Sequence, residues 1–241
     1  MAPLAIRPVR RPIRTKGRLR VTLHSRFSVK SAAISPFRTV REIVESDERG
    51  AAHDAMAKMA CFVSRHLTGR HPDLGRAGPI CPFARQGSAT GGIRFADCDA
   101  RSDEEARIGE IMAQVRDDFL SWGKSSGIPP MLRAFVVTFS ALNGSKDAAM
   151  IERVQRRLKP EYVETGLMIG QFFPGCDEGG IHNPEFRPLD APVISLAVRF
   201  MALADAPFML GDARFRAAYV AQHGASGERE LLLADRRAKA G

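Results

Sequence analysis

The chain has 241 residues, and its 44% hydrophobic content is enough for a folded core and too high for global disorder. No apolar run approaches the ~20 residues of a membrane span, so we expect a soluble protein without a membrane partner. The net charge of +9 is unevenly placed. Residues 1–41 hold 11 of the 36 basic residues and no acid, which leaves 25 basic and 27 acidic residues elsewhere. The composition therefore argues against a basic nucleic-acid-binding face on the folded part.

Residues 1–41 are predicted to form a basic, disordered arm, with order beginning near Ser35. Three alternatives stay open for it: an upstream start of the reading frame, a contact with nucleic acid or another anionic surface, and an Arg-rich targeting sequence. The apolar stretch of a secretory signal is missing. The four cysteines form no Cys-x-x-Cys pair, so we expect free thiols in a reducing cytoplasm. They are Cys61, Cys81, Cys98 and Cys176.

Helical periodicity runs from about Glu42 to His66 and predicts one helix that Gly69 ends. Residues 70–92 are irregular, and a loop of this length in a compact domain is functional or mobile. A short strand follows over 93–96. Next, Ser102 and Glu105 predict a capping box at the start of the clearest amphipathic helix of the chain.

Residues 131–140 are apolar at odd-numbered and at even-numbered positions alike, which predicts a central strand covered on both faces. A helix follows from Ala148 and is predicted to stop at Pro160. Two strands then cover 167–173 and 193–200. Asp212 is predicted to cap a helix that Gly224 ends.

This order of elements predicts an α+β fold in a single domain, with a mixed sheet of four to five strands and helices mostly on one face. We place the domain at residues 42–224 and a charged C-terminal tail at 225–241.

The first candidate site is the loop that holds His71, Asp73, Arg76 and Cys81. Cys81 could be a thiolate ligand or nucleophile, with Arg76 favouring the ionised form. The alternative is a small buried hydrophobe between two prolines.

The second candidate site is the loop 174–190, where His182 lies near Asn183 and Arg187. Neutral imidazole is a common ligand of transition metals and of haem. The alternatives are a solvent-exposed histidine and an asparagine that serves only the turn. Arg199, on the following strand, would meet either a structural acid or a substrate carboxylate if both faces of the sheet are covered.

Three segments together resemble a known family. They are HPDLGRAGPICPF at 71–83, GLMIGQF at 166–172 and IHNPEFRPL at 181–189. They resemble an uncharacterised bacterial domain family found near natural-product biosynthesis genes, over residues 52–210, and no established activity follows from it. The order of elements is also loosely similar to haem-dependent guanidino N-hydroxylases of the guanitoxin type, from which no ligand residue transfers. Phe173 stands where relatives are expected to have a polar residue such as His.

We therefore expect a small-molecule-modifying, oxygenase-like enzyme of specialised metabolism, with haem as the candidate cofactor. Its catalytic candidates are Cys81, His182 and Arg199, its ligand-binding candidates His71, Arg76, Asn183 and Arg187, and its metal-ligand candidates His182, Cys81 and His71. The alternative is a non-enzymatic binding or accessory domain that contacts a partner protein. Nucleic-acid binding is expected only through the basic arm.

Overall fold

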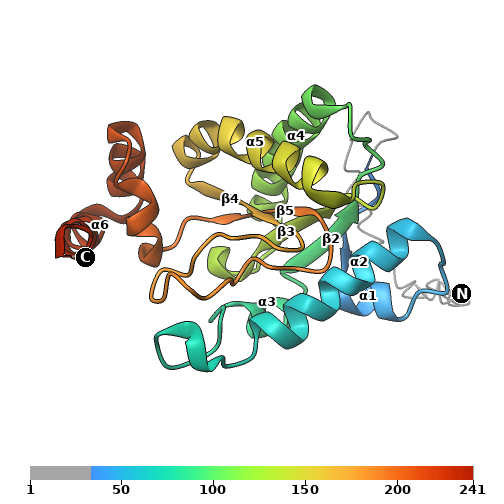
Figure 1. The fold of residues 1–241 in the computed structure, drawn as a ribbon, viewed down its shortest axis with the longest axis horizontal. Coiled ribbons are helices and arrows are strands. Elements are labelled where there is room, and N and C mark those ends of the chain that lie inside the picture. The colour runs from blue at the N-terminus through green and yellow to red at the C-terminus, as the bar shows by residue number, and fades with distance from the viewer. Residues whose placement is uncertain (1–33, 241) are drawn as a thin grey trace, which may run out of the picture.

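The computed structural model describes residues 34–240 and shows an open five-stranded sheet between two layers of helices (Figure 1). The strands lie in the order β1-β2-β3-β5-β4. Their bounds are Arg38–Thr39 for β1, Ile93–Asp97 for β2, Ala134–Thr138 for β3, Leu167–Phe172 for β4 and Ser195–Phe200 for β5. This arrangement confirms the predicted α+β class and the mixed sheet.

The sheet mixes parallel and antiparallel pairs. β2 and β3 are parallel, as a crossover through α4 (Glu105–Ser125) requires. β5 then pairs antiparallel with both β3 and β4. Because β5 enters between them, β3, α5 (Gly144–Glu164) and β4 form a split β-α-β unit. β3 is thus the central strand, and its side chains from Phe135 onward are buried on both faces, as its sequence predicted.

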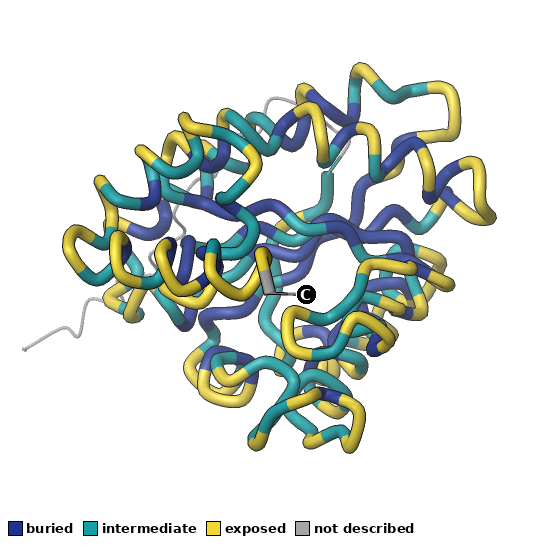
Figure 2. The backbone as a smooth tube through the Cα atoms, turned by 60° about the vertical axis from the view of Figure 1, so that its left-hand side comes forward, coloured by how far each residue is buried: buried dark blue, intermediate teal, exposed yellow. Residues whose placement is uncertain are grey.

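Helices cover both faces of the sheet. The two longest inter-strand helices, α4 and α5, share one face and pack on Phe135, Val137 and Leu196. Shorter helices cover the other face, where α2 (Ala51–Cys61) packs its methionines on Phe95 and Val136. Figure 2 shows the strands as the buried centre, with exposed residues along the outer faces of the helices. The remaining short elements are α1 (Val40–Val44), α3 (Ala84–Ala89), η1 (Phe62–Leu67), η2 (Pro72–Leu74), η3 (Pro130–Leu132) and η4 (Leu203–Met209).

The N-terminal region is ordered from the first described residue. Residues 1–33 of the predicted arm lie outside the described residues, whereas 34–41 contribute a bridge from Ile34 to Cys98, strand β1 and the start of α1. The expected helix over 42–66 is divided into α1, α2 and the π-helical segment η1. Gly50, with φ 124°, precedes α2 in a backbone conformation that a residue with a side chain rarely adopts.

Two predicted helix ends are wrong. Ser102 does not cap α4, because the residue that precedes this helix is Glu104. The Glu104 carboxylate accepts the backbone N–H of Arg101 at 2.8 Å. Pro160 does not stop α5, which continues to Glu164. The last turn is held by packing, because Tyr162 and Val163 are fully buried and the Tyr162 hydroxyl donates to the Met112 carbonyl of α4.

The C-terminal helix α6 (Ala213–Ala240) starts after Asp212, whose carboxylate accepts the Arg214 N–H at 2.8 Å. Gly224, at φ 55° and ψ −142°, breaks it into two parts, as predicted. The second part lies at the end of the molecule away from α1 (Figure 1) and is fastened to the first by a two-pronged Arg216–Asp235 ion pair. No helix of residues 34–240 is long and apolar enough to cross a membrane.

Candidate functional site

A pocket of about 430 Å³ lies where the loop after η1 meets the loop that follows β4. Four of its lining side chains were singled out in the sequence, and four were not. The first group is His71, Asp73, Asn183 and Arg187, and the second is His66, Glu185, Phe186 and Asp190. The structure thus joins the two candidate loops at one pocket.

Direct contacts hold the two loops together. The Asn183 amide nitrogen donates to the Asp73 carbonyl at 2.8 Å, across 110 residues of sequence. Gly75, with φ 76°, lies so close to the opposite loop that an added Cβ would come within 2.6 Å of the His182 carbonyl oxygen. Only glycine combines this left-handed conformation with so close an approach. Asn183 therefore does more than shape its own turn.

His71 forms one wall of the pocket. Its Nδ1 accepts the backbone N–H of Asp73 at 3.2 Å, which caps the short helix η2. The neutral ring therefore carries its proton on Nε2. The ring also packs on Phe186, with ring centroids 4.6 Å apart. His71 is thereby held in one orientation with one free donor.

His66 lies deeper and belongs to the π-helical segment η1. Its ring stacks on Phe62 at 4.8 Å and meets His71 edge-on at 6.4 Å. Its Nε2 is buried and has no hydrogen-bond partner among the described residues. Burial first, and the neighbouring His71 second, lower the pKa of His66, while Asp190 opposes this shift. His66 is therefore neutral at pH 7 and has an unused ring nitrogen.

The charges of the lining are mostly negative. Asp73, Glu185 and Asp190 contribute three carboxylates against the single guanidinium of Arg187. The Arg187 guanidinium donates to the carbonyls of Pro184 and Phe186, and Asp190 accepts the Gly175 N–H at 2.8 Å. The pocket combines acidic edges with an aromatic wall, a combination that favours ligands bearing donors or a positive charge.

Cys81 and Arg76 share the first loop but do not line the pocket. Cys81 packs beside the apolar cluster that α2 forms with Phe95 and Val136, here called the α2 cluster. Its N–H donates to the Leu67 carbonyl at 2.8 Å. The Arg76 guanidinium donates to the carbonyls of Ala77 and Ile80, each at 3.0 Å. Both residues therefore contribute to the shape of their own loop.

His182 and Arg199 also lie outside the lining. His182 is exposed. Arg199 forms a two-pronged pair with the buried Asp205, at 2.6 and 2.7 Å. Burial alone would lower the pKa of Arg199, but the bonds to Asp205 outweigh it and raise the pKa. The acid that Arg199 was expected to meet is therefore a structural partner within the chain.

The metal-ligand candidates His71, Cys81 and His182 are not gathered into one site among the described residues. Within residues 34–240, no group of three or more His, Cys, Asp and Glu side chains is arranged to hold a metal ion. Two cysteines, Cys98 and Cys176, are buried, and burial raises the pKa of both thiols, that of Cys98 to about 11. Both are thus protonated at neutral pH.

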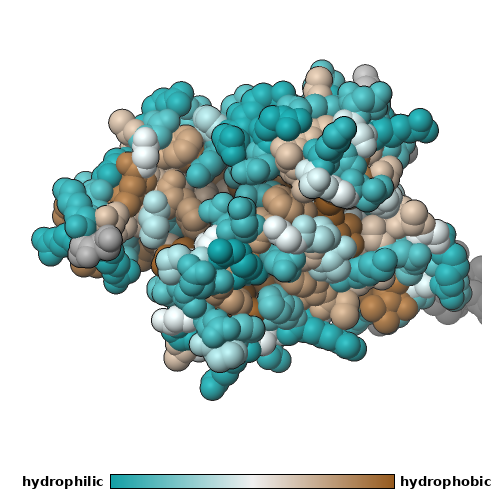
Figure 3. All heavy atoms as spheres, in the orientation of Figure 1, coloured by the Kyte–Doolittle hydropathy of each residue, from teal (hydrophilic) through white to brown (hydrophobic). Residues whose placement is uncertain are grey.

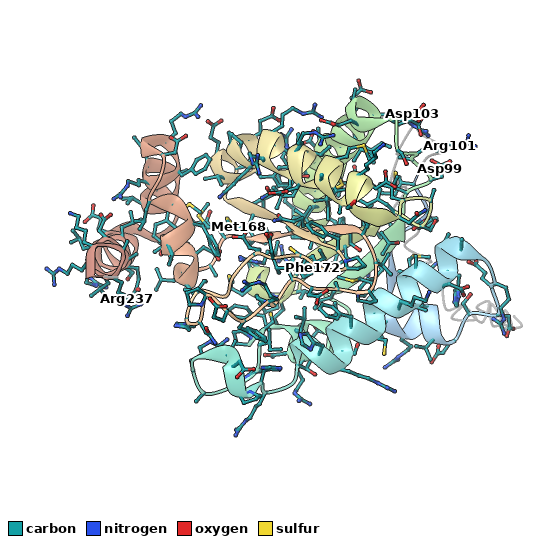
Figure 4. All side chains as sticks on the ribbon, viewed as in Figure 1. Asp99, Arg101, Asp103, Met168, Phe172 and Arg237 are labelled. Carbon is teal, nitrogen blue, oxygen red and sulfur yellow. The ribbon has the colours of Figure 1, made fainter. Side chains whose placement is uncertain are left out.

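A second polar depression lies at the carboxyl ends of β2 and β3, lined by residues that include Asp99, Arg101 and Asp103. Figure 4 places these three side chains together at the edge of the molecule, away from Phe172 of β4 and from Arg237 of α6. Arg107 is paired with Asp99 and Glu104 there. The depression is separate from the histidine pocket.

Residues 56–233 match a family described as a domain of unknown function (DUF6875). No curated protein and no solved structure matches the chain. The match covers well over half of the sequence and includes both loops that form the pocket. The chain therefore belongs to the DUF6875 family, an uncharacterised domain family.

Proposed function

We propose that this domain binds and chemically modifies a small polar molecule in the pocket between the His71 loop and the His182 loop. One observation carries the proposal: the two loops, 110 residues apart in sequence, meet at a pocket in which the rings of His66 and His71 lie edge-on, 6.4 Å apart. Loops that a rigid scaffold brings together are common positions for binding and catalytic residues. Phe172, the last residue of β4, and Phe173, which follows it, do not fill the pocket, since neither lines it.

Acid–base chemistry fits the two imidazoles best. His66 is neutral with an unpartnered ring nitrogen, and His71 offers an Nε2–H donor fixed by its bond to the Asp73 backbone. We propose that the His66 ring accepts a proton and that the His71 ring donates one. Asp190 would stabilise the imidazolium form of His66 once it is protonated, because the carboxylate already acts on that ring.

The lining also favours a class of ligand. Three carboxylates against one guanidinium attract a ligand with a primary amine or another positively charged group. The Phe186 ring provides an apolar surface beside them. A small amine with an apolar portion would satisfy both features.

Two of the three candidate haem ligands lie outside the pocket, which argues against haem. Cys81 and His182 do not line the pocket, and His71 has the wrong tautomer to ligate through Nε2, since ligating histidines donate from the other nitrogen. The carboxylate-rich lining would also repel haem propionates. We therefore propose the function without this cofactor. A Soret band on adding hemin, lost in His71→Ala and kept in His182→Ala, would reverse that conclusion.

Binding can be tested by thermal shift with a panel of small amines and matched carboxylates. We expect amines to raise the melting temperature of the wild type and to have little effect on Asp190→Ala. Asp103→Ala, which removes a carboxylate from the other depression, is the matched control and should respond like the wild type. A preference for carboxylates, or an equal response of all three proteins, would contradict the proposal.

Modification is tested separately, by mass spectrometry of each bound amine after incubation with wild type and with His66→Gln. Conversion that depends on His66 supports acid–base catalysis. A ligand that binds and stays unchanged, with or without common cosubstrates, would favour the alternative, a non-enzymatic binding or accessory domain.

A further inference from the structure

Lys159 lies in an aromatic corner that shares no lining residue with the histidine pocket. It precedes Pro160 on α5 and points at the junction of η4 and α6. Its Nζ is 5.9 Å from the ring centre of Phe208 and 5.5 Å from that of Phe215. Apolar side chains are visible where α6 approaches the body of the molecule in Figure 3. The lysine as a whole is half-buried there.

No acid neutralises this amine. Among the described residues, Lys159 takes part in no ion pair and no side-chain hydrogen bond, although Glu178 and Asp205 act on it from a distance. Asp205 is already bound on both oxygens by Arg199. The ammonium ion thus exchanges water for two ring faces, which replace only part of its hydration.

Half-burial without an acceptor favours the uncharged amine, which is the nucleophilic form of lysine. Burial accordingly lowers the pKa of Lys159, and the two distant carboxylates oppose the shift. The two phenyl rings form an apolar wall beside the nitrogen. The corner thus combines a nucleophile with a surface for an apolar group.

We propose that Lys159 is an acylation site for activated acyl donors, such as thioesters, with an apolar acyl chain. The Nζ lone pair attacks the acyl carbonyl carbon, a C–N bond forms and the C–S bond breaks. The thiolate leaves and takes up the proton that the nitrogen loses, so the products are an amide and a thiol. The apolar chain packs on Phe208 and Phe215.

Competitive labelling of the full chain tests this assignment. The probes are S-octanoyl-N-acetylcysteamine and its S-acetyl counterpart at low concentration, with each lysine quantified by peptide mass spectrometry. Lys124 and Lys146 are exposed and serve as internal references. We expect octanoylation of Lys159 about tenfold faster than of the references, a factor that corresponds to ~1.4 kcal/mol. The acetyl probe should show a smaller preference.

Two variants separate the apolar wall from general reactivity. Phe215→Ser should bring the octanoyl rate of Lys159 close to that of the references. Phe172→Ser, whose ring packs with the α2 methionines and not with the α6 cluster, should keep the preference. Folding of each variant is checked by circular dichroism. Labelling in urea should be uniform among the lysines. The assignment fails if native Lys159 reacts no faster than Lys124 and Lys146, or if Phe215→Ser keeps the full preference.

Discussion

At the scale of single residues, His66 should link the stability of the fold to pH. Burial lowers its pKa in the folded state, so the unfolded chain takes up a proton first as the pH falls. The contribution of this ring is fully present above the unfolded pKa of ~6.5 and is lost as the pH falls through the folded value. The slope should stay well below the ~1.4 kcal/mol per pH unit of a fully buried group, because water screens a half-buried ring.

Urea unfolding at pH 7.5 and pH 5.5 measures this effect. We expect His66→Gln to lose less stability than the wild type between the two pH values. His182→Gln removes an exposed imidazole and should match the wild type. An unchanged pH dependence in His66→Gln would show that this ring is not buried in its neutral form.

The Arg199–Asp205 pair should be structural. Asp205 is 3% exposed, and its carboxylate also accepts the Ala202 N–H at 2.7 Å. Removing it leaves the Ala202 N–H without this acceptor and the Arg199 guanidinium with only its bond to the Phe200 carbonyl at 3.0 Å. Because Arg199 keeps 40% exposure of its side chain, we expect Asp205→Ala to cost about 2 kcal/mol, less than the 3–5 kcal/mol of a sealed pair. The exposed Arg156–Glu152 pair is the control, and Glu152→Ala should cost under ~0.5 kcal/mol. Equal losses in urea unfolding would contradict this role.

At the scale of elements, periodicity predicted the long helix α4 and every strand except the two-residue β1, because each buries an apolar face. It failed where tertiary contacts override local preference. Tyr162 and Val163 carry α5 past Pro160, and their burial outweighs one missing N–H. At η1 the chain is helical up to His66, as predicted, but it is wound as a π-helix, a local change that the apolar pattern of an α-helix does not reveal. His66, placed by η1, was therefore missed.

Gly75 should decide whether the two pocket loops stay together. Gly75→Ala adds the strain of a left-handed alanine, ~1 kcal/mol, and a clash with the His182 carbonyl. Gly127→Ala is a matched control, because its φ of 67° carries the same strain with no atom within 4 Å of the added Cβ. We expect Gly75→Ala to lose clearly more stability than Gly127→Ala and to speed hydrogen exchange at 181–187. Similar behaviour of both variants would mean that the loop contact is dispensable.

At the scale of the whole molecule, the sequence identified both loops of the candidate site but only half of the side chains that line it. Loop length, glycine content and polar side chains can be recognised from the local sequence alone, and Asn183 does connect the two loops. Which side chains point inward depends on how the loops pack. The structure turns Cys81 toward the α2 cluster and exposes His182, while it brings in Glu185 and Asp190. The resemblance likewise identified an uncharacterised family without indicating a reaction.

The C-terminal part of α6 should belong to the folded domain, although its composition suggested a charged tail. Leu231 and Ala234 are each 6% exposed and pack in the cluster that contains Tyr219 and Met201, and the Arg216–Asp235 pair adds a polar clamp. Burial of one leucine contributes ~1.5–3 kcal/mol, and a half-buried pair adds up to ~1 kcal/mol.

Ending the chain at Gly224 should therefore cost about 2–4 kcal/mol in urea unfolding. Ending it at Arg237 removes only residues beyond the last buried turn and should leave stability unchanged within ~0.5 kcal/mol. Equal stability of the two truncated chains would place the domain boundary at Gly224, whereas the expected difference places it beyond Asp235.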